Sequence, residues 1–143
     1  MKMGRYTIFF MGRYKTLNHE KFRLSYHLIF SVKFRRKILE PIKDDLISSL
    51  HRAEGEQAKW KIVYMETDKD HIHFFISATP TDSIASIVHS LKQISTYDMW
   101  QKHHDYLRQF FWKEHFLWTR GYFCSTVGEI SEEKLKDYIE HQG

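Results

Sequence analysis

The sequence has almost none of the residues that would cross-link the chain or anchor it in a membrane. Cys124 is its only cysteine, which excludes an intrachain disulfide and a cysteine-based zinc site. The longest apolar run near the N-terminus, residues 8–11, is too short to span a bilayer and lacks the cleavage site of a signal peptide. We therefore expect a cytoplasmic protein with no membrane partner.

The length and composition fit one globular domain. The chain has 143 residues, of which 42% are hydrophobic and 28% charged, so it can bury a substantial core. No linker or shift in composition marks a second domain. We divide the chain into an N-terminal extension, residues 1–20, and a single domain, residues 21–143.

The charge balance leaves two interpretations open. The formal charge is +4, and 16% of the residues are aromatic. Basic and aromatic side chains together suit a protein that grips phosphates and stacks on unpaired bases. A mildly basic protein with a large aromatic core would have the same composition.

The order of expected elements predicts the fold class. Aromatic and β-branched residues indicate strands, and apolar residues three and four apart indicate helices. The expected strands are residues 23–33, 60–66, 71–78 and 121–127, and the expected helices begin near Pro41, after a cap at residues 79–82, and at Ser131. This is the split βαβ pattern of an α+β, ferredoxin-like or RRM-like domain with an added C-terminal helix. Both long helices should cover one face of an antiparallel sheet and leave the other face open.

Two histidines stand two residues apart at the start of the third expected strand. Strand side chains alternate between faces, so His71 and His73 share the face opposite the core. Two imidazoles on one face can hold a metal ion, and Asp70 is an acidic neighbour. The chain has ten histidines, so a chance pair remains the alternative explanation.

A basic cluster follows the first expected strand. Lys33, Arg35, Arg36 and Lys37 form either a solvated strand end or a contact for DNA phosphates, and the density of charge favours the second. In the last expected helix, Tyr138 and Gln142 are four residues apart and share one face. Taken alone, they would be a half-buried aromatic residue and a surface residue.

Several segments, taken in order, resemble one known family. They are residues 26–30 and 33–36 (opening strand and basic turn), 71–73 (His-hydrophobic-His), 117–128 (the strand before the last helix) and 134–142 (a helix with Tyr and Gln four apart). Together they resemble the small single-tyrosine HUH transposases of the simplest bacterial and archaeal insertion sequences. The resemblance covers about residues 22–142.

The resemblance implies a role for each matching site residue. Tyr138 would attack a phosphodiester of single-stranded DNA and remain joined to the 5′ phosphate. His71, His73 and Gln142 would hold a divalent cation, magnesium or manganese, with Asp70 beside it. Imidazole ligands suit manganese better than magnesium.

The resemblance also implies partners. The family acts as a homodimer on single-stranded DNA ends folded into hairpins. The implied DNA contacts are Lys33, Arg35, Arg36, Lys37, Lys92 and Arg120. The candidates for stacking on bases are Tyr97, Trp100, Phe110, Phe111 and Trp112.

Two related functions remain as alternatives. Gln142 is the penultimate residue of the sequence, and helix ends fray. One alternative is therefore a relative that binds hairpin DNA without cutting it. The other is a repeat-associated tyrosine transposase that processes palindromic repeats with the same chemistry.

Overall fold

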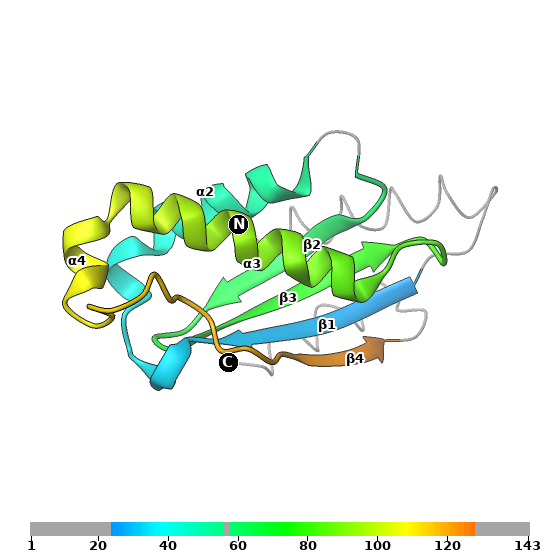
Figure 1. Cartoon of the computed structure of the whole chain (residues 1–143). Coiled ribbons are helices and arrows are strands. Elements are labelled where there is room, and N and C mark those ends of the chain that lie inside the picture. The colour runs from blue at the N-terminus through cyan, green and yellow to red at the C-terminus, as the bar shows by residue number, and fades with distance from the viewer. Residues whose placement is uncertain (1–23, 56–57, 128–143) are drawn as a thin grey trace.

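A computed structural model describes residues 24–55 and 58–127 (Figure 1). Its elements are β1 (Leu24–Ser31), 3-10 turns at Lys33–Arg35 and Glu40–Ile42, α2 (Lys43–Glu54), β2 (Lys61–Thr67), β3 (His71–Ala78), α3 (Ile84–Lys102), α4 (His104–Arg108) and β4 (Phe123–Val127). The N-terminal extension and the expected last helix, with Tyr138 and Gln142, lie outside the described residues.

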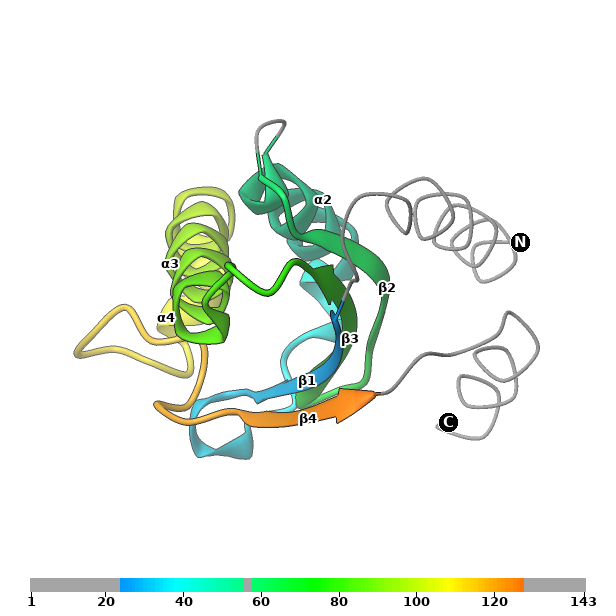
Figure 2. The same cartoon turned by 90° about the vertical axis from the view of Figure 1, so that its right-hand side faces the viewer.

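The four strands form one antiparallel sheet in the order β2-β3-β1-β4. Helices α2 and α3 lie on the same side of this sheet (Figure 2). Both observations confirm the predicted ferredoxin-like arrangement. Strands β2 and β3 form a hairpin, whose turn is closed by the backbone N–H of Asp68 donating to His71 O at 2.8 Å. No helix among the described residues is long and apolar enough to cross a bilayer.

The alternation predicted for β3 is confirmed on its inner face. Ile72, Phe74 and Ile76 are fully buried beneath the helices. The opposite face is less open than predicted, since Phe75 is only 4% exposed and Ser77 only 2%. The ring of His27 on β1 stacks on Phe75, with ring centroids 5.2 Å apart. Along β3, this face is therefore more accessible at His71 and His73, whose side chains are half-buried.

The observed starts of the two long helices agree with the sequence-based prediction, except for the capping residue of α3. Helix α2 follows the turn that contains Pro41 and ends at Gly55, which adopts φ 70°, a conformation that glycine tolerates without a steric penalty. The cap of α3 is Ser83, whose hydroxyl accepts a hydrogen bond from Ser86 N, so the expected cap at residues 79–82 was wrong. The Asp82 carboxylate instead accepts from Thr79 N at 2.8 Å and closes the preceding turn.

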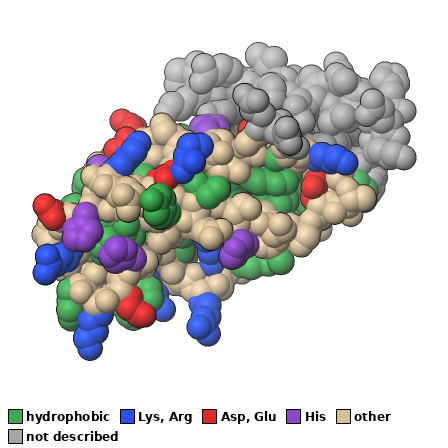
Figure 3. Space-filling model, turned by 45° about the horizontal axis from the view of Figure 1, so that its top comes forward, with side chains coloured by type: hydrophobic (Ala, Val, Ile, Leu, Met, Phe, Trp, Pro, Cys, Tyr) green, Lys and Arg blue, Asp and Glu red, His purple; other side chains and the backbone are tan. Residues whose placement is uncertain are grey.

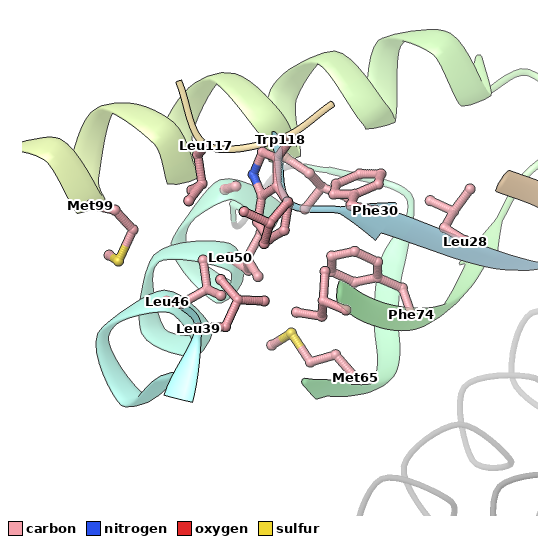
Figure 4. Packing of buried hydrophobic residues seen from close by; sticks show 14 of the residues in the cluster. Leu28, Phe30, Leu39, Leu46, Leu50, Met65, Phe74, Met99, Leu117 and Trp118 are labelled. Carbon is pink, nitrogen blue, oxygen red and sulfur yellow. The ribbon is translucent and has the colours of Figure 1, made fainter. Parts of the chain in front are cut away.

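The core fills the space between the sheet and the two long helices (Figure 4). Trp118, from the segment before β4, lies 5.6 Å from Phe30, ring centroid to ring centroid. Its indole N–H donates to the hydroxyl of Ser95 on α3 at 2.9 Å, and that hydroxyl donates to Leu91 O at 2.6 Å. Because Ser95 is fully buried, this bond ties the segment before β4 to α3.

Replacing Ser95 by alanine should destabilise the domain by about 1–3 kcal/mol, because the buried indole N–H of Trp118 loses its acceptor. Urea unfolding followed by circular dichroism measures the change. Ser86→Ala is the matched control, since Ser86 lies exposed on the same helix. Equal midpoints for Ser95→Ala and the parent chain would contradict the importance of this bond.

Candidate active site

The two histidines of β3 meet at the accessible end of the sheet. The ring centroids of His71 and His73 are 4.9 Å apart, and the rings stand at 68° to each other. Both side chains are half-buried. The strand therefore brings the predicted pair together, with the two rings close enough to share one ligand.

A carboxylate orients the ring of His71. Its Nδ1–H donates to Asp70 Oδ1 at 2.8 Å, since a carboxylate can only accept. Asp70 Oδ2 also accepts from Arg35, whose Nε and a terminal nitrogen lie 3.2 Å and 3.1 Å away. The hydrogen bond from His71, followed by the charge of Arg35, holds the pKa of Asp70 below its ordinary value. Asp70 thus engages Nδ1 of the His71 ring and leaves Nε2 for another partner.

A further histidine, His27 on β1, lies within hydrogen-bond distance of His73. Nε2 of His27 lies 3.1 Å from Nδ1 of His73, and His27 is only 4% exposed. Burial first, and then the neighbouring charges of His71 and His27, lower the pKa of His73 to about 4. His73 is therefore neutral at neutral pH. When its Nδ1–H donates to His27, its Nε2 lone pair is free to bind a ligand.

Sequence reasoning missed two residues at this site. His27 lies on another strand, and only the β1–β3 register, in which Ile29 faces His73 and His27 faces Phe75, brings it here. Asp68 was treated only as part of a turn. Its Oδ2 lies 4.0 Å from Nε2 of His71.

The donor set fits a divalent cation of the later transition series or manganese. Each imidazole has its Nδ1 in a hydrogen bond, the arrangement typical of histidine ligands in metal sites. Within the described part of the chain, no three His, Cys, Asp or Glu side chains are grouped to hold a metal. His71 and His73 therefore offer two ligands, and the expected third, Gln142, lies outside the described residues.

The basic turn after β1 lies next to this pair. Backbone hydrogen bonds join Val32 N to Asp70 O at 2.9 Å and Leu39 N to Lys69 O at 3.1 Å, so the turn is fixed against the β2–β3 hairpin. Of the four predicted phosphate contacts, Arg35 already binds Asp70. The Lys33 ammonium lies 4.7 Å from the centroid of the Phe116 ring. Arg36 and Lys37 are exposed.

The remaining two predicted DNA contacts differ in environment. The Lys92 ammonium donates to the carbonyl oxygens of Thr119, Arg120 and Gly121 at 2.8, 3.0 and 2.9 Å. Its three protons are thereby used, and burial lowers its pKa. These contacts favour a role in holding the segment before β4. Arg120 is exposed and lines a groove of about 650 Å³ along α3.

The structure separates the candidates for base stacking. Trp100 and Phe111 are 3% and 4% exposed and belong to the core. Trp112 and Tyr97 are 69% and 63% exposed and line different grooves. The face in Figure 3 carries interspersed positive and negative side chains, so charge of one sign does not dominate it.

Comparison with known proteins identifies the family. Residues 20–142 match the family described as Transposase IS200 like. The chain is also 32% identical over 132 residues to the transposase of insertion sequence IS200 from Salmonella typhimurium, covering 92% of this chain and 85% of that protein. The chain belongs to the IS200-like transposase family. The predicted resemblance to single-tyrosine transposases is confirmed.

Other known proteins are similar to this transposase in sequence or in fold. The ISDra2 transposase TnpA of Deinococcus radiodurans is 32% identical, with 85% of each chain covered. A crystal structure of a proposed transposase from Deinococcus radiodurans R1 has a TM-score of 0.66 at 31% identity, covering 85% of this chain and 92% of that one. The structure of a REP-associated tyrosine transposase bound to a REP hairpin shares the fold, with a TM-score of 0.56 at 12% identity over 82% of this chain and 61% of that one.

Proposed function

We propose that this transposase cleaves and rejoins single-stranded DNA at the ends of an insertion sequence through a 5′-phosphotyrosine intermediate on Tyr138. The observation that carries the proposal is the orientation of the two imidazoles. Asp70 and His27 engage the Nδ1 atoms of His71 and His73, which leaves both Nε2 atoms available at the accessible end of the sheet.

The proposed reaction needs an activated phosphate. An unperturbed tyrosine titrates near 10 and is a weak nucleophile at neutral pH. A divalent cation held by His71, His73 and Gln142 would supply Lewis-acid polarisation of the scissile phosphate. The Tyr138 oxygen bonds to phosphorus while the bond from phosphorus to the 3′ oxygen breaks. The phenol loses one proton and the 3′ oxygen gains one, so it leaves as a hydroxyl. The phosphotyrosine linkage conserves the phosphodiester, so the strand can be rejoined without ATP.

Hairpin-ended single-stranded DNA is the proposed substrate, and a homodimer is the proposed active form. Support for the substrate comes from the family and from the fold shared with a transposase whose structure contains a REP hairpin. Exposed Arg36, Lys37 and Arg120 offer cations for its phosphates.

The experiment uses a hairpin oligonucleotide with single-stranded flanks, taken from the DNA that borders the reading frame, together with the full chain and Mn²⁺. We expect a covalent protein–DNA adduct that denaturing electrophoresis retains and EDTA prevents. Mass spectrometry should place the linkage on a tyrosine. Tight binding without an adduct in Mg²⁺, Mn²⁺ or Co²⁺ would refute cleavage and favour a relative that only binds hairpins.

A further inference from the structure

A small aromatic groove lies beside the basic turn. It measures about 260 Å³ and is lined mainly by the rings of Phe34, Phe110, Phe111, Trp112 and Phe116. Pockets for drug-sized ligands usually measure about 300–1,000 Å³. The smaller volume suits a single planar ring system.

Two rings of this aromatic groove, those of Phe34 and Trp112, are exposed to solvent. Phe34 is 65% exposed and Trp112 69%, whereas Phe111 at the base is 4% exposed. The Phe34 ring lies 6.5 Å from Phe111 and 6.3 Å from Phe116, centroid to centroid. Phe111 and Phe116 thus join the groove to the core, while Phe34 and Trp112 present open ring faces on which a second aromatic system can stack.

The backbone holds Phe34 in this position at an energetic cost. Phe34 and Arg35 have φ values of 60° and 53°. These lie in the left-handed region of backbone conformation, which residues other than glycine rarely adopt. Each such residue costs about 1–2 kcal/mol. A hydrogen bond from Arg35 N to Val32 O at 2.8 Å and the ion pair of Arg35 with Asp70 maintain the conformation. Strain of this kind is typical of ligand-binding positions.

Positively charged side chains surround the aromatic groove and favour a ligand that carries phosphates. The Lys33 ammonium lies 5.4 Å from the Phe34 ring centroid, and Lys113 lines the groove. Arg36 and Lys37 follow on the same turn and are exposed. Aromatic faces combined with cations are the features that bind bases and phosphates of single-stranded nucleic acid. Glu114, also in the lining, can accept a hydrogen bond from an exocyclic amine of a base.

The basic turn links the aromatic groove to the histidine pair. Phe34 precedes Arg35, Arg35 binds Asp70, and Asp70 binds His71. We propose that the aromatic groove, chiefly Phe34 and Trp112, binds an unpaired base of the DNA strand whose phosphate reacts at the histidine pair. This inference rests on the proposed function, because it assigns a base-binding site to the same substrate.

The test measures binding of uncleaved oligonucleotides in EDTA, so that neither metal nor Tyr138 contributes. Trp112→Leu and Phe34→Leu should each weaken binding of a hairpin with single-stranded flanks about 5- to 150-fold, the range found when a stacked base loses its aromatic partner. Trp112→Phe, which keeps an aromatic face, should stay within about 3-fold of the parent. Thermal melting should be nearly unchanged, because both side chains are exposed.

A second measurement locates the base. Photocrosslinking with 5-iodouracil, placed in turn along the flank, should join one position to Trp112 or Phe34. An abasic site at that position should weaken binding by the parent chain and have no further effect on Trp112→Leu. Unchanged affinity of both leucine variants would refute the groove as a base-binding site, even if the parent chain forms the covalent adduct. A change of oligomeric state in Trp112→Leu, with DNA affinity retained, would also refute it and assign the groove to a second copy of the chain.

Discussion

Replacing Tyr138 by phenylalanine is expected to abolish the covalent protein–DNA adduct while leaving hairpin binding within about 3-fold. Phenylalanine lacks the only oxygen that could form the proposed ester, so strand cleavage should fall by at least ~10³-fold, as it does when other enzymes lose their nucleophile. Denaturing electrophoresis of 5′- and 3′-labelled strands measures cleavage. Fluorescence anisotropy measures binding.

The control for this variant is Tyr26→Phe. Tyr26 packs partly buried against the core, on the helix-covered face of β1, and has no proposed part in the reaction. It should form the adduct at the parental rate. If Tyr138→Phe still produced an adduct, another residue would be the nucleophile.

Replacing His73 by alanine should weaken Mn²⁺ binding by more than about 100-fold and should remove cleavage. This loss exceeds the roughly 10- to 100-fold expected when a residue that only hydrogen-bonds a metal ligand is replaced. The ring contributes one of two described imidazoles, and its low pKa, about 4, keeps it neutral and able to bind metal at neutral pH. Isothermal titration calorimetry with Mn²⁺ measures the affinity directly. Circular dichroism confirms that the sheet is retained.

Two further histidine variants test whether the loss is specific. His27→Phe keeps a ring against Phe75 but removes the partner of His73 Nδ1, so Mn²⁺ affinity should fall about 10- to 100-fold. His104→Ala removes an exposed ring on α4 and should leave the affinity unchanged. Equal Mn²⁺ affinity of His73→Ala and the parent chain would show that the histidine pair is not the metal site.

The fold followed from the sequence because its signals are local. The alternation in β3 predicted that Ile72 and Phe74 face the core, and Pro41 lies in the turn that leads into α2, where the helix was expected to begin. The cap of α3 was misplaced because residues 79–82 also carry turn signals, and Asp82 closes that turn while Ser83 caps the helix.

The candidate site was only half predictable, because its supporting contacts are long-range. His71 and His73 lie two residues apart in one strand, so their spacing revealed them. His27 reaches His73 from 46 residues away, and only the strand register could place it. The resemblance implied that Lys92 contacts DNA, yet its ammonium binds three carbonyl oxygens that lie 27 to 29 residues further on. Such contacts depend on how loops pack, which local patterns do not encode.

The carboxylate of Asp70 has a thermodynamic consequence. It is shared between Arg35, a predicted phosphate contact, and His71, a predicted metal ligand. A phosphate that draws Arg35 away would leave the negative charge of Asp70 less neutralised. Since Asp70 accepts a hydrogen bond from His71, the imidazole of His71 would then become a stronger ligand for a metal ion. Because coupling between two binding events is reciprocal, the proposed metal would change DNA affinity by the same factor by which DNA changes metal affinity. On the proposed function, Asp70 would therefore favour metal binding when the DNA substrate is already in place.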